Sequence, residues 1–193
     1  MEKDLINNPI KMILIGGSAG SLQVILRLLP DLQLQLPVTI VLILHRKPAS
    51  DETLTDLLSS RTAWAVSEAE DKETILPNHI YIAPADYHLL VESDHTLSLD
   101  VSEKVNYSRP SIDITFESAA EVYGPALLAI LLSGANADGL EGMKNIKAAG
   151  GTCVVQDPES AEVSYMPLQA IGHVAIDKIL HADEMAAYIN GLF

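Results

Sequence analysis

Residues 11–29, KMILIGGSAGSLQVILRLL, constrain the fold more than any other stretch of the chain. Met12–Ile15 is a continuous apolar run, as expected of a strand buried on both faces, and Gly16–Gly20 supplies a tight turn of small residues. Apolar residues then recur at helical spacing over 22–29. The stretch therefore predicts a buried strand, a sharp turn with Ser18 at its apex, and a helix.

Ser18 is the centre of a G-x-S-x-G pattern, which is typical of a nucleophile elbow. Small neighbours permit strained backbone angles that hold a serine hydroxyl above the sheet. The structural alternative is that Ser18 only caps the helix, since serine is a favoured N-cap. A nucleotide-binding turn fits less well, because the Gly-Lys-Ser/Thr ending of a P-loop is absent. A dinucleotide fingerprint would need glycine in place of Ser18 and an acid in place of His45.

Beyond this stretch, apolar runs alternate with helical patterns along most of the chain. Such alternation is the signature of a parallel sheet covered by helices. The expected strands are Met12–Ile15, Val38–Leu44, Ala126–Leu132 and Thr152–Val155, with shorter ones at Trp64–Val66 and Val174–Ile176. The expected helices lie at 22–29, 51–59, 113–122, 140–149 and 183–189.

Two segments depart from this alternation. Short extended runs at His79–Ala83, His88–Glu92 and Leu97–Val101, separated by turn-like residues, predict an antiparallel hairpin region. Residues 161–171 are expected to be helical in pieces, because Pro167 interrupts them. The predicted fold class is α/β, with a doubly wound, mostly parallel sheet, helices on both faces and an antiparallel hairpin excursion.

The composition is typical of one globular domain over residues 1–193, with no repeat or linker. Charged residues are 20% of the chain and hydrophobic residues 48%. The net charge of −14 argues against nucleic acid or an anionic membrane surface as a partner. The polar N-terminus is unlike a secretory signal, and the longest apolar runs are too short to span a bilayer. The default expectation is a cytoplasmic protein that does not insert into a membrane.

Two further features are better explained by structure than by chemistry. Cys153, the single cysteine, lies in an apolar run, so we expect a buried thiol rather than a nucleophile. His79, His88 and His95 fall in the hairpin region, but their spacing matches no tight metal-ligand motif. We expect turn or core roles for them, and the sequence implies neither a metal nor an organic cofactor.

Ser18, His45 and Asp138 each occur just past the carboxyl end of a predicted buried strand. In open parallel sheets, ligands bind at that edge. A serine hydroxyl becomes a good nucleophile when an imidazole takes its proton and a carboxylate orients the imidazole. The three residues are therefore predicted to form a complete set for acyl transfer. The alternative is three unrelated roles: a helix cap, a polar residue at a strand end and an acid in the first turn of a helix.

The order of these residues along the chain argues against one familiar fold. The α/β-hydrolases run Ser, Asp, His and place several strands before the nucleophile. Here the order is Ser, His, Asp, and 17 residues precede Ser18. The α/β-hydrolase fold is therefore not expected, despite the shared G-x-S-x-G.

Six motifs follow one another along nearly the whole chain: IGGSAGS at Ile15–Ser21, LH at Leu44–His45, YIAPADYH at Tyr81–His88, SRPSID at Ser108–Asp113, LLSGANADGLEG at Leu131–Gly142 and QDPESAEVSYMPLQAI at Gln156–Ile171. In this order they resemble the catalytic domain of the chemotaxis protein-glutamate methylesterase family, CheB.

The resemblance implies hydrolysis of glutamate γ-methyl esters on chemoreceptors, with release of methanol and, in many members, deamidation of receptor glutamines. Carried over by motif position, Ser18 would be the nucleophile, His45 the general base and then acid, and Asp138 the residue that orients His45. Arg109, in the family's Arg-Pro-Ser segment, is a further candidate for substrate contact. The implied partner is a methylated or amidated protein, and no cofactor is implied.

Three residues depart from the family's usual pattern. Ala19 stands where threonine is common, Ser21 where glycine is usual, and Ala135 where methionine is usual. Ala19 and Ala135 keep their backbone N–H groups, so an oxyanion hole made from these backbone donors is still expected.

Many family members carry an N-terminal receiver domain that occludes the active site until it is phosphorylated. Here the catalytic motif starts almost at residue 1. If this is the full chain, the alternatives are constitutive activity, control by a separate regulatory protein, or a target other than a chemoreceptor. The same departures motivate a rival function, a non-catalytic signalling or binding module on this fold. A nucleotide-binding Rossmann-like domain is the third reading.

Overall fold

The computed structural model describes residues 9–47 and 53–193, which contain a seven-stranded parallel sheet in the order β10-β9-β8-β1-β2-β5-β3. Its strands are β1 (Met12–Gly17), β2 (Thr39–Leu44), β3 (Ala65–Glu68), β5 (His79–Ile82), β8 (Leu127–Leu131), β9 (Thr152–Gln156) and β10 (Lys178–Leu180). Every neighbouring pair in this sheet is parallel. The predicted α/β class is confirmed.

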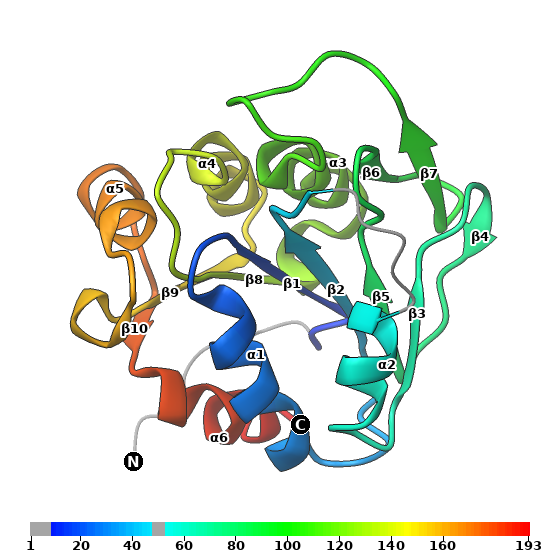
Figure 1. The fold of residues 1–193 in the computed structure, drawn as a ribbon, viewed down its shortest axis with the longest axis horizontal. Helices are drawn as coiled ribbons and strands as arrows, with labels where there is room; N and C mark the ends of the chain where they lie inside the picture. The colour runs from blue at the N-terminus through cyan, green and yellow to red at the C-terminus, as the bar shows by residue number, and fades with distance from the viewer. Residues whose placement is uncertain (1–8, 48–52) are drawn as a thin grey trace.

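Helices cover both faces of the sheet (Figure 1). One face is covered by α1 (Ser21–Leu28), α2 (Thr53–Ser59) and α6 (Met185–Asn190), and the other by α3 (Ile112–Tyr123), α4 (Leu140–Ala148) and α5 (Tyr165–His173). Along β1, Ile13 and Ile15 join one hydrophobic core, while Met12 and Leu14 join the other. Because both faces are covered, β1 is a continuous apolar run in the sequence.

The strand order reverses beside β1, at the centre of the sheet. β2, β5 and β3 lie on one side of β1, in that spatial order, and come before β8 in the chain. β8, β9 and β10 come later in the chain and lie on the other side of β1. In open α/β sheets, ligands bind outside the carboxyl ends of the strands at such a point. Ser18 follows β1 and the segment to Asp138 follows β8, so two of the predicted site residues come from the two strands that border the reversal.

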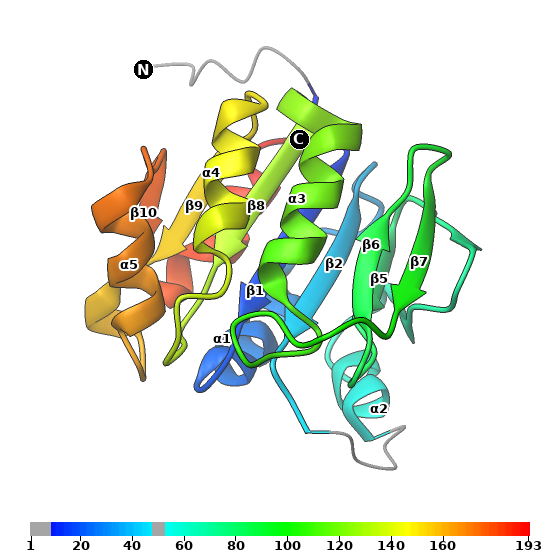
Figure 2. The same cartoon turned by 90° about the horizontal axis from the view of Figure 1, so that it is seen from above.

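The antiparallel part is composed differently from the prediction. β6 (His88–Val91) and β7 (Thr96–Asp100) lie side by side and pair as a hairpin (Figure 2). The two-residue β4 (Glu73–Thr74) pairs with β7. Residues 79–82, which were expected in this hairpin region, instead join the main sheet as β5, between β2 and β3. That expectation was wrong because partner choice depends on contacts distant in sequence, which a short extended run does not encode.

The C-terminal third also differs in one detail. α5 is continuous from Tyr165 to His173, so Pro167 does not interrupt it. Pro167 is the third residue of the helix, where a backbone N–H has no acceptor inside the helix and its loss is tolerated. The predicted start of α2 at Asp51 lies outside the described residues. In the described part of the chain, no helix has the length and apolar character needed to cross a membrane.

Candidate active site

Ser18 begins a tight turn between β1 and α1. Its carbonyl oxygen accepts hydrogen bonds from Ser21 N–H, at 3.1 Å, and from Ser21 Oγ, at 2.5 Å. Gly20 has φ 81° and ψ −15°, the third position of a type II turn, where glycine is strongly preferred. The positive φ of this turn is therefore at Gly20, and Ser18 itself does not have a positive φ. Gly20 is also the N-cap of α1, and no side chain caps that helix.

The register of the sheet brings Ser18 and His45 to the same edge. Gly17 pairs with Leu44 across β1 and β2, and His45 N–H donates to the Gly17 carbonyl at 3.1 Å. Ser18 and His45 are thus the next residues on adjacent parallel strands. Both line a pocket of about 210 Å³, whose walls include Leu22. The half-buried Ser18 hydroxyl makes no hydrogen bond with any residue that the structure describes.

The turn after β8 packs directly against the Ser18 turn. Ser18 N–H donates to the Ser133 carbonyl at 2.9 Å, and the buried Ser133 hydroxyl donates to the Ala19 carbonyl at 2.6 Å. A Cβ atom added at Gly134 would lie 3.1 Å from Ser18 Cβ, which is closer than Cβ atoms usually approach other atoms. The two turns therefore pack closely at Gly134. This turn ends at Asp138, whose side chain is fully buried.

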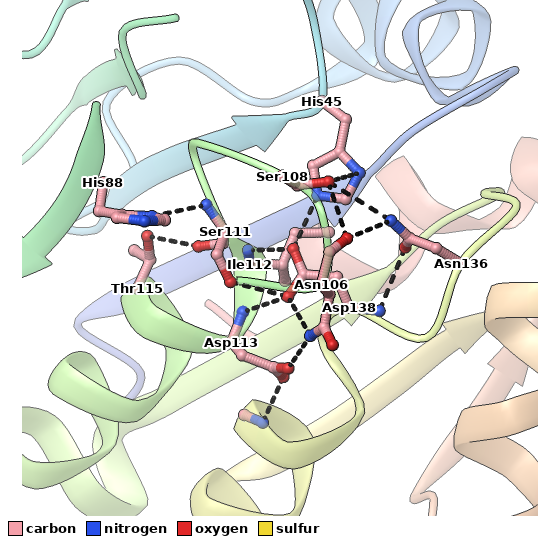
Figure 3. Close-up of polar contacts among 11 residues, drawn as sticks. His45, His88, Asn106, Ser108, Ser111, Ile112, Asp113, Thr115, Asn136 and Asp138 are labelled. Carbon is pink, nitrogen blue, oxygen red and sulfur yellow. Dashed lines mark hydrogen bonds and ion pairs between the residues drawn. The ribbon is translucent and has the colours of Figure 1, made fainter. Parts of the chain in front are cut away.

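His45 is hydrogen-bonded on both ring nitrogens (Figure 3). Its Nε2 lies 2.7 Å from Asp138 Oδ2, and its Nδ1 lies 3.3 Å from the hydroxyl of Ser108. Because an ionised carboxylate only accepts hydrogen bonds, Nε2 carries the proton and Nδ1 keeps a lone pair. The His45 side chain is 10% exposed. The structure thus joins His45 to Asp138 and leaves Nδ1 as the basic nitrogen.

The carboxylate of Asp138 accepts hydrogen bonds from five groups, which come from His45 and from residues around the start of α3 (Figure 3). Besides His45, the donors are Ile112 N–H at 2.6 Å, the Ser111 hydroxyl at 2.8 Å, Asp113 N–H at 3.1 Å and Asn106 Nδ2 at 3.3 Å. Free amides at the first turn of a helix are natural donors to an anion. The arrangement holds a negative charge at a fixed position beside His45.

Asp138 and Asp113 are neighbouring carboxyl groups whose pKa values are displaced in opposite directions. Burial alone would raise the pKa of Asp138, but the hydrogen bonds from His45 and from the Ile112 and Asp113 amides outweigh it and lower that pKa. Burial raises the pKa of Asp113 to about 6, and the charge of Asp138 adds to this, although Gly142 N–H donates to it. Asn106 Nδ2 contacts both carboxylates. The negative charge is therefore favoured on Asp138.

His88 supports this network from inside the protein. Its buried ring accepts from Ser111 N–H at 3.1 Å and donates to the Glu103 carbonyl at 2.9 Å. Ser111 in turn donates its hydroxyl to Asp138. His88 was expected in a turn or core role, and its place behind Ser111 could not be found from the spacing of the histidines.

The other two histidines and Cys153 make separate contacts. His79 stacks on Tyr81 and bonds to Ser67, and His95 lies against Tyr123. No group of three His, Cys, Asp or Glu side chains that could hold a metal ion was found among residues 9–47 and 53–193. Cys153 is buried, and burial raises the pKa of its thiol to about 12, so the thiol stays protonated at neutral pH.

The turn at Val105–Ser108 was not among the elements expected from the sequence. Val105 and Ser108 exchange two backbone hydrogen bonds, and both central residues, Asn106 and Tyr107, have positive φ, at 50° and 64°. The turn therefore directs Asn106 toward Asp138 and Ser108 toward His45. Asparagine is among the residues that adopt this backbone most readily, and it was the one local signal.

The remaining predicted residues lie around this centre. Ala19 and Ala135 are exposed on the two packed turns, and neither backbone N–H donates a hydrogen bond within the described part of the chain. The guanidinium of Arg109 donates to Asp86 at 2.8 Å and to the carbonyls of Val101 and Ser102 at 2.8 and 2.7 Å. Arg109 thus holds a surface loop, and its predicted contact with substrate stays a prediction.

These groups are of the chemical types that acyl transfer requires. A hydroxyl without a hydrogen-bond partner shares a pocket with an imidazole whose tautomer is fixed by a buried carboxylate. Two backbone N–H groups on adjacent turns are available to a developing oxyanion. The set matches a nucleophile, a base, an orienting carboxylate and oxyanion donors.

Comparison with known proteins agrees with this chemistry. The family model described as CheB methylesterase matches residues 13–189. Two proteins of Leptospira interrogans, each named putative protein-glutamate methylesterase/protein-glutamine glutaminase, are 43% identical over 174 residues, which are 90% of this chain and 90% of each relative. A Thermotoga maritima protein-glutamate methylesterase/protein-glutamine glutaminase is 35% identical over 89% of this chain and 51% of its own length.

A solved structure extends the likeness to three dimensions. The crystal structure of the Thermotoga maritima CheB methylesterase catalytic domain superposes with a TM-score of 0.91 at 33% identity. The match covers 96% of this chain and 100% of that domain. The chain therefore spans nearly all of the two Leptospira relatives and about half of the longer Thermotoga protein.

Proposed function

The chain belongs to the CheB methylesterase family, and from that membership we propose that it hydrolyses γ-methyl esters of glutamate side chains on chemoreceptors. The relatives' names include glutaminase activity, and we extend the proposal to deamidation of glutamine side chains. One observation carries the proposal. His45, whose Nε2 lies 2.7 Å from the buried Asp138 carboxylate, lines the same pocket as Ser18.

In the proposed first half-reaction, Ser18 Oγ attacks the ester carbonyl carbon and its proton passes to His45 Nδ1. The buried charge of Asp138 stabilises the imidazolium that forms. The carbonyl oxygen becomes an oxyanion that accepts hydrogen bonds from the Ala19 and Ala135 N–H groups. His45 then gives the proton to the methoxy oxygen, the C–O bond breaks and methanol leaves.

In the second half-reaction, water hydrolyses the acyl-enzyme. His45 Nδ1 takes a proton from the water as its oxygen attacks the acyl carbon, and it returns that proton to Ser18 Oγ as the glutamate leaves. For a glutamine substrate the leaving group is ammonia. The partner is then a methylated or amidated protein, and the proposal places the enzyme in the cytoplasm with the methylated part of the receptor.

The test compares Ser18→Ala with Ser108→Ala, because both hydroxyls come from the edge that contains His45. Methanol release from a methylated chemoreceptor cytoplasmic fragment should fall on the order of 10⁴ to 10⁶ fold for Ser18→Ala, since triad members act as a unit. Ser108→Ala should retain at least about a tenth of the wild-type rate, since it removes one neutral hydrogen bond. A serine-reactive phosphonate should modify Ser18 stoichiometrically in the wild type.

The reverse result would assign the nucleophile to Ser108. No methanol release and no labelling in a folded wild-type sample would favour the non-catalytic module, which the names of the relatives do not support. Tight binding of a nucleotide without esterase activity would point to the third reading, the Rossmann-like domain.

A further inference from the structure

A second cleft opens beside the Ser18 pocket. It has a volume of about 350 Å³, and it shares His45, Arg46 and Lys47 with that pocket. The rest of its lining comes from the segment between β7 and α3 and from Asp86. Figure 2 shows this segment running along the edge of the sheet where β1 leads into α1. Because the two pockets share His45, Arg46 and Lys47, the second cleft is within reach of residues that neighbour an ester placed at Ser18.

This cleft gathers positive charge in an acidic protein. The chain has a net charge of −14 and only 12 Lys and Arg residues, and four of these line the cleft: Arg46, Lys47, Lys104 and Arg109. The two arginines are compensated by ion pairs with Glu68 and Asp86. Lys47 and Lys104 are exposed, and neither has an ion-pair partner within residues 9–47 and 53–193. Among the described residues, these two ammonium groups are the charges of the cleft that can attract an anion.

Tyr107 adds an aromatic surface at the rim of the same cleft. Its side chain is 97% exposed, and its φ of 64° is uncommon for a bulky residue. Strained backbone of this kind tends to persist where it serves a site. The neighbouring turn residues, Asn106 and Ser108, contact Asp138 and His45, so the strain positions groups of the active site and presents Tyr107 to solvent.

We propose that this cleft binds free carboxylate side chains of the substrate polypeptide, next to the esterified glutamate. The inference rests on the proposed function for the position of the ester at Ser18. The chemistry is consistent, because each turnover of the proposed ester hydrolysis leaves a free glutamate carboxylate on the substrate polypeptide. A protein of net charge −14 would repel such a segment unless its docking surface were locally positive. The enzyme would therefore select esters that lie in acidic segments.

The experiment measures binding, which needs no turnover. Two peptides each contain one glutamyl methyl ester, flanked by glutamates in one and by glutamines in the other. Ser18→Ala protein should bind the glutamate peptide roughly 3 to 10 fold more tightly at about 0.1 M salt, as expected for two exposed ion pairs. The preference should disappear at about 1 M salt, where charges on the surface are screened.

Matched lysine variants locate the effect. In the Ser18→Ala protein, Lys104→Glu should abolish the preference for the glutamate peptide. Lys11→Glu makes the same change of net charge at an exposed position before β1, at the opposite edge of the sheet, and should preserve the preference. Equal affinity for the two peptides, equal losses in the two lysine variants, or no binding of either peptide would overturn the proposal.

The proposed function can fail separately. If the wild-type protein releases no methanol from either peptide while the Ser18→Ala protein still prefers the glutamate peptide, the esterase proposal falls and the acidic docking site stands. If both peptides are hydrolysed with the same kcat/KM, the esterase stands and the docking site falls.

Tyr107→Asn tests the aromatic rim apart from the charge. Asparagine adopts positive φ more readily than tyrosine, so the variant should melt at the wild-type temperature or above. Its affinity for both peptides should nevertheless fall together by about threefold or more, because the aromatic contact does not depend on flanking charge. Unchanged affinity would remove Tyr107 from the docking surface.

Discussion

Asp138 and Ser18, the two proposed partners of the His45 imidazole, are held in opposite ways. The Asp138 carboxylate is fully buried and accepts hydrogen bonds from five groups. The Ser18 hydroxyl is half-buried and has no hydrogen-bond partner in the described chain. A group that must keep one charge in one place gains from being fixed, whereas a nucleophile must move toward its substrate. The hydrogen bonds of this site are therefore concentrated on the charge and not on the reacting atom.

Among the variants that test this difference between Asp138 and Ser18, Asp138→Asn is expected to have the largest effect. An amide cannot accept from all five donors, and it no longer selects the tautomer with a lone pair on His45 Nδ1. We expect kcat for methanol release to fall about 10⁴ fold, the scale known for loss of the carboxylate in such triads. Circular dichroism should show that the variant is folded. A loss of less than tenfold would mean that the charge on Asp138 is not needed to orient His45.

A second variant acts on the Ser18 side and tests the oxyanion donor. Ala19 is the second residue of the type II turn from Ser18 to Ser21, a position that accepts proline. Ala19→Pro should therefore keep the turn while deleting the N–H. We expect kcat to fall about 10² to 10³ fold with little change in the melting temperature.

Ala19→Gly is the matched control, because it keeps the N–H and should stay within a few fold of the wild type. If Ala19→Pro also stays within a few fold, the donor on the Ser18 turn is not part of the oxyanion hole.

The contrast also explains what could be predicted from the sequence. β1, β2 and β8 were predicted because strands buried on both faces are continuous apolar runs. Ser18, His45 and Asp138 follow those strands, so their common edge was predictable from the topology alone. The structure brings His45 and Asp138 into contact, while the catalytic roles of all three residues stay a proposal.

The groups that support Asp138 were not predictable in the same way. Asn106 donates to it from a strained turn, and Ser111 donates to it from the start of α3, while His88 on a hairpin strand accepts from Ser111 N–H. Each contact joins positions more than twenty residues apart, and nothing in the local pattern of any of them indicates its partner. The placement of β5 in the main sheet was missed for the same reason.

A smaller effect is expected when one donor to Asp138 is removed. Ser111→Ala deletes the hydroxyl at 2.8 Å and leaves Asn106 and the α3 amides in place. Because several donors share the charge, we expect kcat/KM to fall only about tenfold, on the scale of one hydrogen bond to a charged group. Ser21→Ala removes one hydroxyl from the Ser18 turn and is the matched control, with an expected change below threefold. Equal effects of the two substitutions would mean that hydrogen bonds to Asp138 matter no more for activity than hydrogen bonds within the Ser18 turn.

The smallest effect concerns Asp113, the carboxyl group that shares Asn106 with Asp138. Its pKa is about 6 in the folded protein against 3.8 in the unfolded chain, so between these values the folded state holds a proton that the unfolded state has released. The free energy of unfolding therefore decreases as the pH rises through this window. Asp138 has the opposite sign: its pKa is lowered, so its contribution is present above pH 3.8 and is lost as the pH falls further.

Asp113→Asn removes only the contribution that decreases with rising pH. Relative to the wild type, the variant should become progressively more stable from about pH 4 to pH 6, with a constant difference above that, in urea unfolding measured at each pH. At any one pH, the difference in free energy of unfolding between the variant and the wild type also includes the changed hydrogen bond from Gly142 N–H. The test is therefore how this difference changes with pH, and not its size at a single pH. A constant difference from pH 4 to pH 7 would mean that both carboxyl groups ionise freely, and that the site does not reserve its buried charge for Asp138.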